Sequence, residues 1–235
     1  MKKNEEISYL AELISDFPTS NSISPQEAFN KIFNRYHALS FRNLDFLMQD
    51  IIENIKNKLN KAKNKKEVIR VKFPTIFYYL IQVIHAILFY DILSNAGKFR
   101  NKNDKNNGFV GFGGNKNGKL KFNGVDPDKI DECVINACSH LKEKTTFPVE
   151  NSMRFYQNFV YAHPFYDANG RIGRLIVTLY LSKFNLVINW EKVESNKKFM
   201  KRLNECHKRA EKPEEFEKYF ALLINYINKF IIKLN

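Results

Sequence analysis

The chain is poor in the features that mark secreted and membrane proteins. It has only three cysteines among 235 residues, without Cys-x-x-Cys spacing, which argues against a disulfide framework and a zinc site. The longest apolar run, 77–93, is interrupted by Gln82, His85 and Asp91, so it predicts a buried helix and not a membrane span. No apolar core of signal-peptide length follows the basic N-terminus. We therefore expect a reduced, cytoplasmic protein without a membrane partner.

The sequence also lacks the motifs of nucleic-acid-binding domains, although its formal net charge is +13. A strongly basic protein can bind nucleic acid. Here the basic residues are spread along the chain with one concentration at 56–72, and asparagine is abundant beside lysine. An AT-rich genome produces the same composition. A non-enzymatic, basic binding protein is therefore less favoured than an enzyme, and a nucleic-acid partner is not expected.

Glycine is scarce outside one segment, because seven of the nine glycines lie between Gly97 and Gly124. The rest of the chain shows helical apolar spacing without an internal repeat. The spacing predicts helices over 7–17, 26–39, 43–62, 73–95, 126–144, 150–161, 171–184, 190–210 and 214–234. These helices predict an all-α protein with an N-terminal helical extension over 1–65 and a core over 66–235.

The glycine-rich segment is the only β element that the sequence predicts. Residues 108–122 have the pattern of strand, turn and strand, with a hairpin signal at Asn117-Gly118. An exposed edge strand can bind the main chain of another protein, although a surface hairpin without a role is the alternative. The segment is not a Walker loop, because no Gly-Lys-Ser/Thr follows it.

The densest chemistry lies in residues 163–174, His-Pro-Phe-Tyr-Asp-Ala-Asn-Gly-Arg-Ile-Gly-Arg. His163 can accept a proton near neutral pH, and Asp167 is a hard oxygen ligand suited to Mg²⁺. The turn at 168–170 can direct backbone N–H groups at an anion. Arg171 and Arg174 are three residues apart, so on a helix they share a face and can bind phosphate oxygens.

Apolar residues follow this segment at once, which predicts a helix that begins near Arg171. The N-terminus of that helix would direct free N–H groups and a positive dipole at a ligand held by the loop. Phe165 is apolar in a polar loop, and we expect it to anchor the loop in the core. Each residue alone would be an ordinary loop or surface residue. Together they predict a site for phosphoryl or nucleotidyl transfer.

These twelve residues resemble the active-site motif of the Fic (filamentation induced by cAMP) family in the Fic/Doc superfamily, His-Pro-Phe-x-(Asp/Glu)-Gly-Asn-Gly-Arg-x-x-Arg. Eight of the nine specified positions are met, and Ala168 replaces a glycine. The Doc branch also carries alanine there, but it has lysine in place of Gly170 and lacks the last arginine. The chain therefore resembles the AMP-transferring branch more than the phosphorylating one. Residues 97–100, Gly-Lys-Phe-Arg, resemble the segment that precedes the family's β-hairpin flap, here about 97–124.

The resemblance implies a Fic-type helical domain with a flap and a protein adenylyltransferase activity. Such an enzyme transfers AMP from ATP, with Mg²⁺, to a Ser, Thr or Tyr hydroxyl of a target protein. It implies that His163 is the general base, that Asp167 binds the metal, and that the nucleotide is bound by Ala168, Asn169, Gly170, Arg171, Gly173 and Arg174. It also implies that the target docks on flap residues Phe109, Val110, Gly111 and Phe112. A Doc-like protein kinase and a transferase that uses CDP-choline or UTP are the alternatives.

Many members of the family are inhibited by a helix with the motif (Ser/Thr)-x-x-x-Glu-(Gly/Asn), whose glutamate pairs with the last arginine of the active-site motif. Two segments have this spacing, Ser8 to Glu12 and Ser139 to Glu143, but leucine and lysine follow them. We therefore expect no complete internal inhibitory helix. Inhibition would come from a separate, antitoxin-like protein, or the enzyme would be unrestrained.

Overall fold

The computed structural model describes residues 27, 30, 31, 34, 35, 53, 73–90, 92–113, 120–195 and 197–234. The chain divides into two compact units, Met1–Phe99 and Arg100–Asn235. The predicted helix over 7–17, most of those over 26–39 and 43–62, and the predicted boundary after residue 65 lie outside the described residues. The extension over 1–65 therefore stays a prediction.

The first unit contains α4 (Phe73–Phe89), the buried helix that the long apolar run predicts. Its buried side chains recur at helical intervals, as Ile76, Phe77, Leu80, Ile81, Ile84 and Leu88. The helix ends at Phe89 instead of residue 95, and a turn over 94–97 follows. Gly97 has a φ of 76° and donates its N–H to Nδ1 of His85 at 2.9 Å, a backbone conformation that favours glycine. Within the described part of the chain, no helix combines the length and the apolar character needed to cross a membrane.

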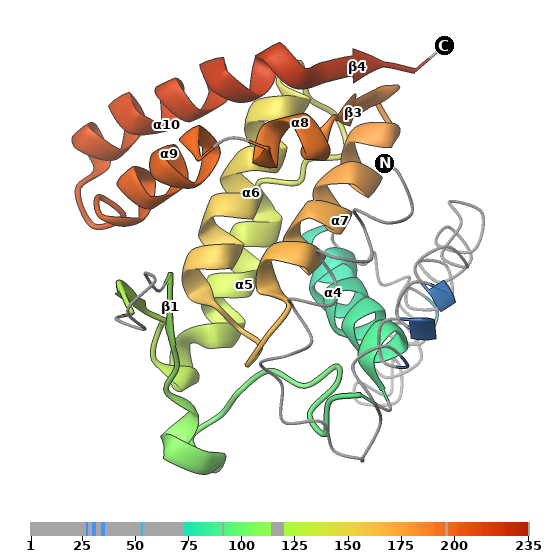
Figure 1. Ribbon diagram of the computed structural model, residues 1–235, viewed down its shortest axis with the longest axis vertical. Helices are drawn as coiled ribbons and strands as arrows, with labels where there is room; N and C mark the ends of the chain where they lie inside the picture. Colours follow the sequence, from blue (N-terminus) through green and yellow to red (C-terminus); the bar gives the residue numbers. More distant parts are fainter. Residues whose placement is uncertain are drawn as a thin grey trace, which may run out of the picture. The chain divides into compact units, whose positions relative to one another are not determined.

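The second unit is built around two adjacent helices, α6 (Pro148–Ala162) and α7 (Asn169–Ser182), which pack side by side (Figure 1). The helix predicted over 126–144 is a 3-10 turn, η2 (Pro127–Lys129), followed by α5 (Ile130–Ser139), which packs on α6. Asp126 caps this turn by accepting the N–H of Asp128 at 3.0 Å. The helical class predicted from the sequence is confirmed.

Close approach of α6 and α7 depends on Gly173. A Cβ atom at this position would lie 2.9 Å from Cδ2 of Tyr156 on α6, nearer than side chains normally approach. Around this contact, apolar side chains of both helices are fully buried, among them Phe155, Phe159, Ile172 and Ile176. Burial of each such side chain stabilises the fold by roughly 1.5–3 kcal/mol. This packing fixes the positions of the two helix ends that border the motif loop.

The C-terminal part differs from the predicted pair of long helices. The first is divided into α8 (Trp190–Glu194) and α9 (Lys198–His207), because its buried residues Val193 and Phe199 are six apart, a spacing that one helix face does not provide. The second is α10 (Pro213–Ile227), followed by η3 (Asn228–Phe230) and β4 (Ile231–Lys233).

Strand β4 pairs antiparallel with β3 (Leu186–Ile188), and Val187 lies opposite Ile232. The expectation of a single β element was therefore wrong. Three successive apolar residues, 230–232, cannot all lie on one helix face, and the β-branched Ile231 and Ile232 favour a strand.

The predicted hairpin is present in the second unit. Strand β1 (Gly111–Phe112) pairs antiparallel with β2 (Phe122–Asn123), with Gly111 opposite Asn123 and Phe112 opposite Phe122. The predicted turn at 117–118 lies outside the described residues. Before β1, the chain forms η1 (Lys105–Gly108).

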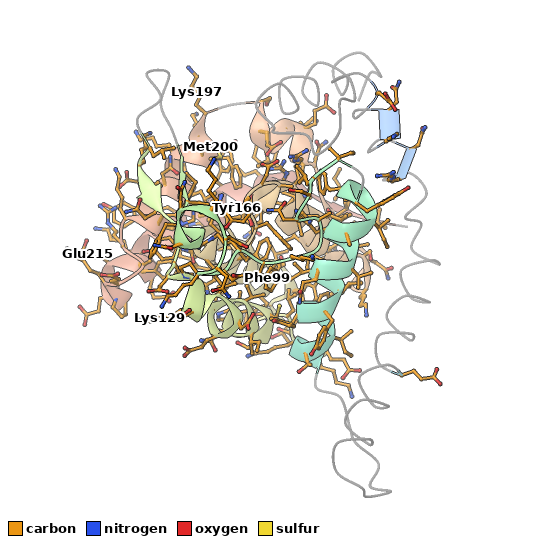
Figure 2. All side chains as sticks on the ribbon, turned by 90° about the horizontal axis from the view of Figure 1, so that it is seen from below. Phe99, Lys129, Tyr166, Lys197, Met200 and Glu215 are labelled. Atoms are coloured by element: carbon orange, nitrogen blue, oxygen red, sulfur yellow. The ribbon has the colours of Figure 1, made fainter. Side chains whose placement is uncertain are left out.

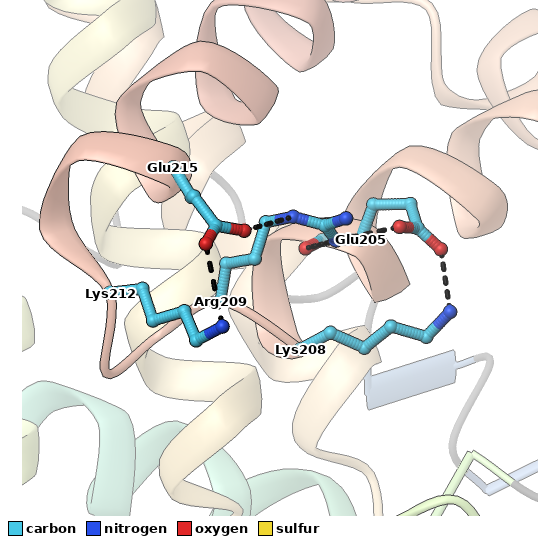
Figure 3. A network of polar contacts seen from close by, with 5 residues as sticks. All are labelled: Glu205, Lys208, Arg209, Lys212 and Glu215. Atoms are coloured by element: carbon cyan, nitrogen blue, oxygen red, sulfur yellow. Dashed lines mark hydrogen bonds and ion pairs between the residues drawn. The ribbon is translucent and has the colours of Figure 1, made fainter.

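A network of ion pairs fixes the turn between α9 and α10. Its members are Glu205, Lys208, Arg209, Lys212 and Glu215 (Figure 3). Arg209 lies at the centre, 2.6 Å from Glu205 and 3.3 Å from Glu215, and its guanidinium lies 3.6 Å from the centre of the Tyr219 ring. Single surface pairs contribute about 0–1 kcal/mol, but a network that shares one arginine restrains the turn as a whole.

Arg100 joins the hairpin to the motif loop. Its side chain is 1% exposed and donates four hydrogen bonds, all to backbone carbonyls. Two acceptors flank the hairpin, Gly108 at 2.7 Å and Val125 at 2.6 Å. The other two acceptors lie at the C-terminal end of α6, the carbonyls of Ala162 at 3.0 Å and His163 at 2.7 Å. Burial lowers the pKa of the Arg100 guanidinium, yet arginine stays a cation because its ordinary pKa is so high.

We predict that Arg100→Lys destabilises the protein by roughly 2–4 kcal/mol, because an ammonium group cannot reach four carbonyls in this planar arrangement and leaves buried acceptors unpaired. The free energy of unfolding in denaturant measures this loss. The matched control is Arg202→Lys, since Arg202 donates to the Leu222 carbonyl at the surface. Equal losses for the two variants would contradict the role assigned to Arg100.

Candidate active site

The motif loop connects α6 to α7 and is bounded by two residues with positive φ. His163 ends α6 with a φ of 51°, and Ala168 precedes α7 with a φ of 62°. A left-handed conformation costs a residue with a Cβ atom about 1–2 kcal/mol, so Ala168 occupies a position whose backbone is better suited to the glycine that the motif has there. Helix α7 begins at Asn169, two residues before the predicted start.

Buried contacts hold the loop in place from within. Phe165 is 1% exposed, and its ring meets that of Phe159 edge-on with centroids 6.4 Å apart. Asn169 is 2% exposed, accepts the N–H of Phe165 at 3.0 Å and donates to its carbonyl at 2.9 Å. The Asn169 side chain, expected to bind a phosphate, is thus used inside the loop. One amide hydrogen of Asn169 is used in this way, and the second amide hydrogen or the backbone N–H at the start of α7 can donate to a phosphate, so the phosphate contact of Asn169 stays a prediction.

Tyr166 attaches the loop to the segment before the hairpin. Its hydroxyl donates to Oδ2 of Asp104 at 2.8 Å, and burial together with this carboxylate raises the pKa of Tyr166 to about 12. In Figure 2 Tyr166 lies among the closely packed side chains, whereas Lys197 and Glu215 lie at the edge. With Arg100, this bond gives the loop a second connection to the chain that precedes β1.

His163 presents the nitrogen that a general base requires. Its Nδ1 lies 3.3 Å from the Val160 carbonyl, which can only accept, so Nδ1 carries the proton and Nε2 is the basic atom. Burial, with a smaller contribution from the cation of Arg100, lowers the pKa of His163 to about 4, although the hydrogen bond to Val160 opposes this shift. The ring stacks on Phe112 of β1, with centroids 4.4 Å apart and planes at 10°. His163 is therefore neutral at pH 7 and able to accept a proton.

The two arginines of the motif lie on the first turns of α7 and are paired with carboxylates. Arg171 donates to Oδ2 of Asp167 at 2.9 Å. Arg174 lies 2.6 Å from Oε1 of Glu194, the last residue of α8. Burial raises the pKa values of Asp167 and Glu194, and the neighbouring arginine opposes the rise in each case. The site thus holds two cations whose charges are offset by two acids.

The two glycines of the motif differ in their surroundings. A Cβ atom at Gly170 would meet only ordinary contacts, the nearest being Nη1 of Arg174 at 3.6 Å. Gly173 faces Tyr156 across the contact between α6 and α7, so packing alone explains glycine there. Direct contact of either residue with a nucleotide stays a prediction.

The acidic groups of the site suit a cation that is bound partly by the protein and partly by a phosphate. No group of three or more His, Cys, Asp or Glu side chains that could hold a metal occurs in the described ranges. Mg²⁺ typically binds one or two carboxylates and completes its shell with water and substrate phosphates. Asp167, half-buried at the start of α7, can supply such a carboxylate when a nucleotide supplies the phosphates.

Glu194 is the residue at this site that sequence reasoning missed. The inhibitory motif has Ser or Thr four residues before its glutamate, and Trp190 stands at that position before Glu194. Glu194 reaches Arg174 only because the chain reverses after α7 and α8 packs back, with Nε1 of Trp190 donating to Oγ1 of Thr178 at 3.1 Å. A tertiary contact of this kind has no local signal. Glu143 is exposed in the loop after α5, and Glu12 lies outside the described residues.

A second histidine, His207 at the end of α9, also lies at this site. It is 3% exposed, and burial lowers its pKa to about 3, helped by the nearby His163. Both histidines therefore have folded-state pKa values below the value of about 6.5 expected for an unfolded chain. Their neutral forms stabilise the fold above pH 6.5, and this contribution is lost as the pH falls towards 4.

We predict that the free energy of unfolding decreases between pH 6.5 and 5, with a slope of up to about 1.4 kcal/mol per pH unit for each of the two histidines. His207→Gln keeps a hydrogen-bonding side chain but does not titrate, so its slope should be smaller by about that amount. Denaturant titrations at several pH values measure the slope. Identical slopes for the variant and the wild type would show that His207 titrates normally.

The model of one protein family matches part of the chain. Residues 75–181 match the Fic/DOC family, from the first turn of α4 to the last turn of α7, with the motif loop between α6 and α7. No curated protein matches the sequence.

Three solved structures are similar. The BepC protein of Bartonella tribocorum, with bound AMPPNP, is 13% identical with a TM-score of 0.50, over 93% of each chain. The N-terminal Fic domain of a VirB-translocated Bep effector protein of Bartonella quintana, with bound ADP, is 13% identical with a TM-score of 0.52, over 93% of this chain and 92% of that one. A Fic domain containing signaling protein of Bacteroides thetaiotaomicron is 16% identical with a TM-score of 0.50, over 95% and 84%. At these identities the likeness concerns the fold.

Proposed function

Because the chain belongs to the Fic/DOC family, we propose that it is a protein adenylyltransferase, which transfers AMP from ATP to a hydroxyl side chain of a target protein. The family match and the nucleotides bound in two of the similar structures support a Fic-type nucleotide transferase. AMPPNP and ADP in those structures support an adenine nucleotide as the substrate. The identity of the transferred group is the part that we propose.

The observation that carries the proposal is the position of His163. Its basic Nε2 belongs to a loop that leads directly into the N-terminus of α7, where Arg171 and Arg174 follow. The helix N-terminus and the two guanidinium groups can bind the phosphates of ATP, and His163 can accept a proton beside them. Proton acceptor and phosphate site therefore belong to one continuous stretch of twelve residues.

The reaction follows from these roles. The target hydroxyl gives its proton to Nε2 of His163, and its oxygen attacks the α-phosphorus of ATP. As the new oxygen–phosphorus bond forms, the bond from the α-phosphorus to the bridging oxygen breaks, and pyrophosphate leaves with its electrons. Asp167 would hold Mg²⁺, which supplies neutralisation of the phosphate charge. Arg171 and Arg174 orient the β- and γ-phosphates, so the protein contributes position and charge.

The ion pair of Arg174 with Glu194 bears on how ATP binds. A guanidinium that already holds a carboxylate at 2.6 Å must exchange that partner before it can bind the γ-phosphate. Glu194 therefore competes with the terminal phosphate of ATP but not with AMP, which has none. A separate inhibitory protein stays a prediction, and Glu194 offers a restraint within the chain itself.

We predict that His163→Ala lowers AMP transfer by about 10²–10⁴-fold, the range typical of losing a general base, while ATP binding persists. Transfer of label from α-labelled ATP to protein measures the rate, and calorimetry measures binding. Label transferred only from γ-labelled ATP would indicate a Doc-like kinase. Label from CDP-choline or UTP alone would indicate another transferase. Unchanged transfer in His163→Ala would remove His163 from the mechanism.

We predict that Glu194→Gln raises the affinity for ATP by roughly tenfold or more and leaves that for AMP nearly unchanged, since hydrogen bonds to charged groups contribute about 1.5–3 kcal/mol. Arg174→Ala should weaken ATP binding and abolish the gain from Glu194→Gln, which a double-mutant cycle detects. Glu191→Gln on the same helix, where Glu191 is exposed, is the matched control. A gain in affinity that persists without Arg174 would contradict the competition.

A further inference from the structure

Four aromatic rings connect α9 to the general base. His207 meets Phe122 with centroids 5.4 Å apart and Phe112 with centroids 5.9 Å apart, edge-on in both cases. Phe112 and Phe122 lie opposite each other in the hairpin with ring centroids at 5.4 Å, and Phe112 stacks on His163. We call these four residues the aromatic bridge. It joins three segments that are far apart in the sequence.

The outer end of the bridge is fixed in place. Nε2 of Gln157 on α6 lies 3.3 Å from Nδ1 of His207, and because an amide nitrogen can only donate, Nδ1 of His207 accepts this hydrogen bond. The ring of Tyr161, one turn later on α6, stacks on His207 with centroids 5.5 Å apart. The ion-pair network of Arg209 extends from Glu205, two residues before His207, to Glu215, and it restrains the turn that follows His207 (Figure 3). His207 is therefore a rigid support for the hairpin.

The inner end of the bridge acts on His163. The ring of His163 makes one hydrogen bond, through Nδ1 to Val160 at 3.3 Å, and a single bond of this length permits the ring to tilt. Phe112 lies almost parallel to the ring and covers one of its faces. Stacking fixes the plane of the imidazole and leaves its Nε2 edge for a proton. A general base works only when that edge points at the hydroxyl group.

We propose that His207 is a positioning residue for the general base: it supports the hairpin pair Phe112 and Phe122 from outside, and Phe112 fixes the ring of His163. Neither sequence patterning nor the motif points to this role, because His207 lies 33 residues after Arg174 in a separate helix. The catalytic meaning of the arrangement rests on the proposed function of His163. The geometric claim, that the bridge holds the His163 ring, does not depend on it.

The pKa of His163 reports whether Phe112 covers its ring, because the pKa depends on the surroundings of the ring. Among the described residues, the charged group that acts on its ring is Arg100, which donates to the His163 carbonyl, and the neighbouring titratable group is His207, which burial keeps neutral. Burial is the larger cause of the low pKa of His163, and Phe112 supplies part of that burial. Loss of Phe112, or of its support, lets water reach the ring, so the pKa of His163 should rise towards 6.5.

The experiment is an NMR titration of the His163 ring in the labelled full-length protein, with circular dichroism as the check of folding. Phe112→Ala should raise the pKa of His163 by about one unit or more, and His207→Ala by about half a unit or more. His207→Phe, which keeps an aromatic edge, should restore a value close to that of the wild type. Leu120→Ala, which removes a 55% exposed side chain beside the same hairpin, should leave the titration unchanged.

Two further measurements complete the test. If His207→Ala does not fold, His207→Leu replaces it, since leucine keeps volume without a ring, and it should shift the pKa of His163 as expected for alanine. In AMP transfer by Phe112→Ala and by the His207 variants without a ring, kcat should fall while the KM for ATP stays constant. The acid limb of their pH profiles should move with the pKa of His163. Unchanged titration in folded Phe112→Ala and His207 variants would overturn the proposal. Shifted titration without any AMP transfer would instead refute the proposed function and leave the bridge intact.

Discussion

The position of the motif loop depends on one buried cation, Arg100. Its guanidinium binds carbonyls from both flanks of the hairpin and from the last turn of α6, so the hairpin and the loop cannot move apart without leaving polar groups unpaired in the interior. The backbone N–H of Arg100 adds a bond to the Pro164 carbonyl at 2.9 Å. Gly124 makes room for this arrangement, because a Cβ atom there would lie 2.6 Å from Nη2 of Arg100.

The loop itself has a rigid backbone, and the ion pairs beside it have partners that can be replaced. Asn169 and Phe165 close it through buried bonds, and the positive φ of Ala168 is held by the helix that follows. The two arginines, by contrast, are held by the carboxylates of Asp167 and Glu194. A phosphate could replace a carboxylate as the partner of an arginine, and a metal ion could replace Arg171 as the partner of Asp167. A site of this kind is neutralised without ligand and becomes a strong anion site when its acids are displaced or bind a cation. On the proposed function, binding of ATP would be an exchange of these partners.

Local patterns were sufficient to predict the parts of the fold that depend on neighbours in the sequence. The apolar spacing of α6 and α7 and the run of glycines before β2 predict a helix pair and a hairpin, and the structure has both. The β3–β4 pair joins segments about 45 residues apart, and the division between α8 and α9 follows from a six-residue gap between Val193 and Phe199. At the site, His163 and the arginines could be named from the motif. Glu194 and His207 could not, because each reaches the site only through helices that pack back on the core.

The central claim is that His163 directs transfer of an AMP group to a protein hydroxyl. The most direct test is the intact mass of the full-length protein, and of candidate target proteins mixed with it, after incubation with ATP and Mg²⁺. We expect adducts with the mass of one AMP group on Ser, Thr or Tyr, formed by the wild type and almost absent with His163→Ala. Adducts with the mass of a single phosphate group, or AMP adducts formed equally by His163→Ala, would contradict it.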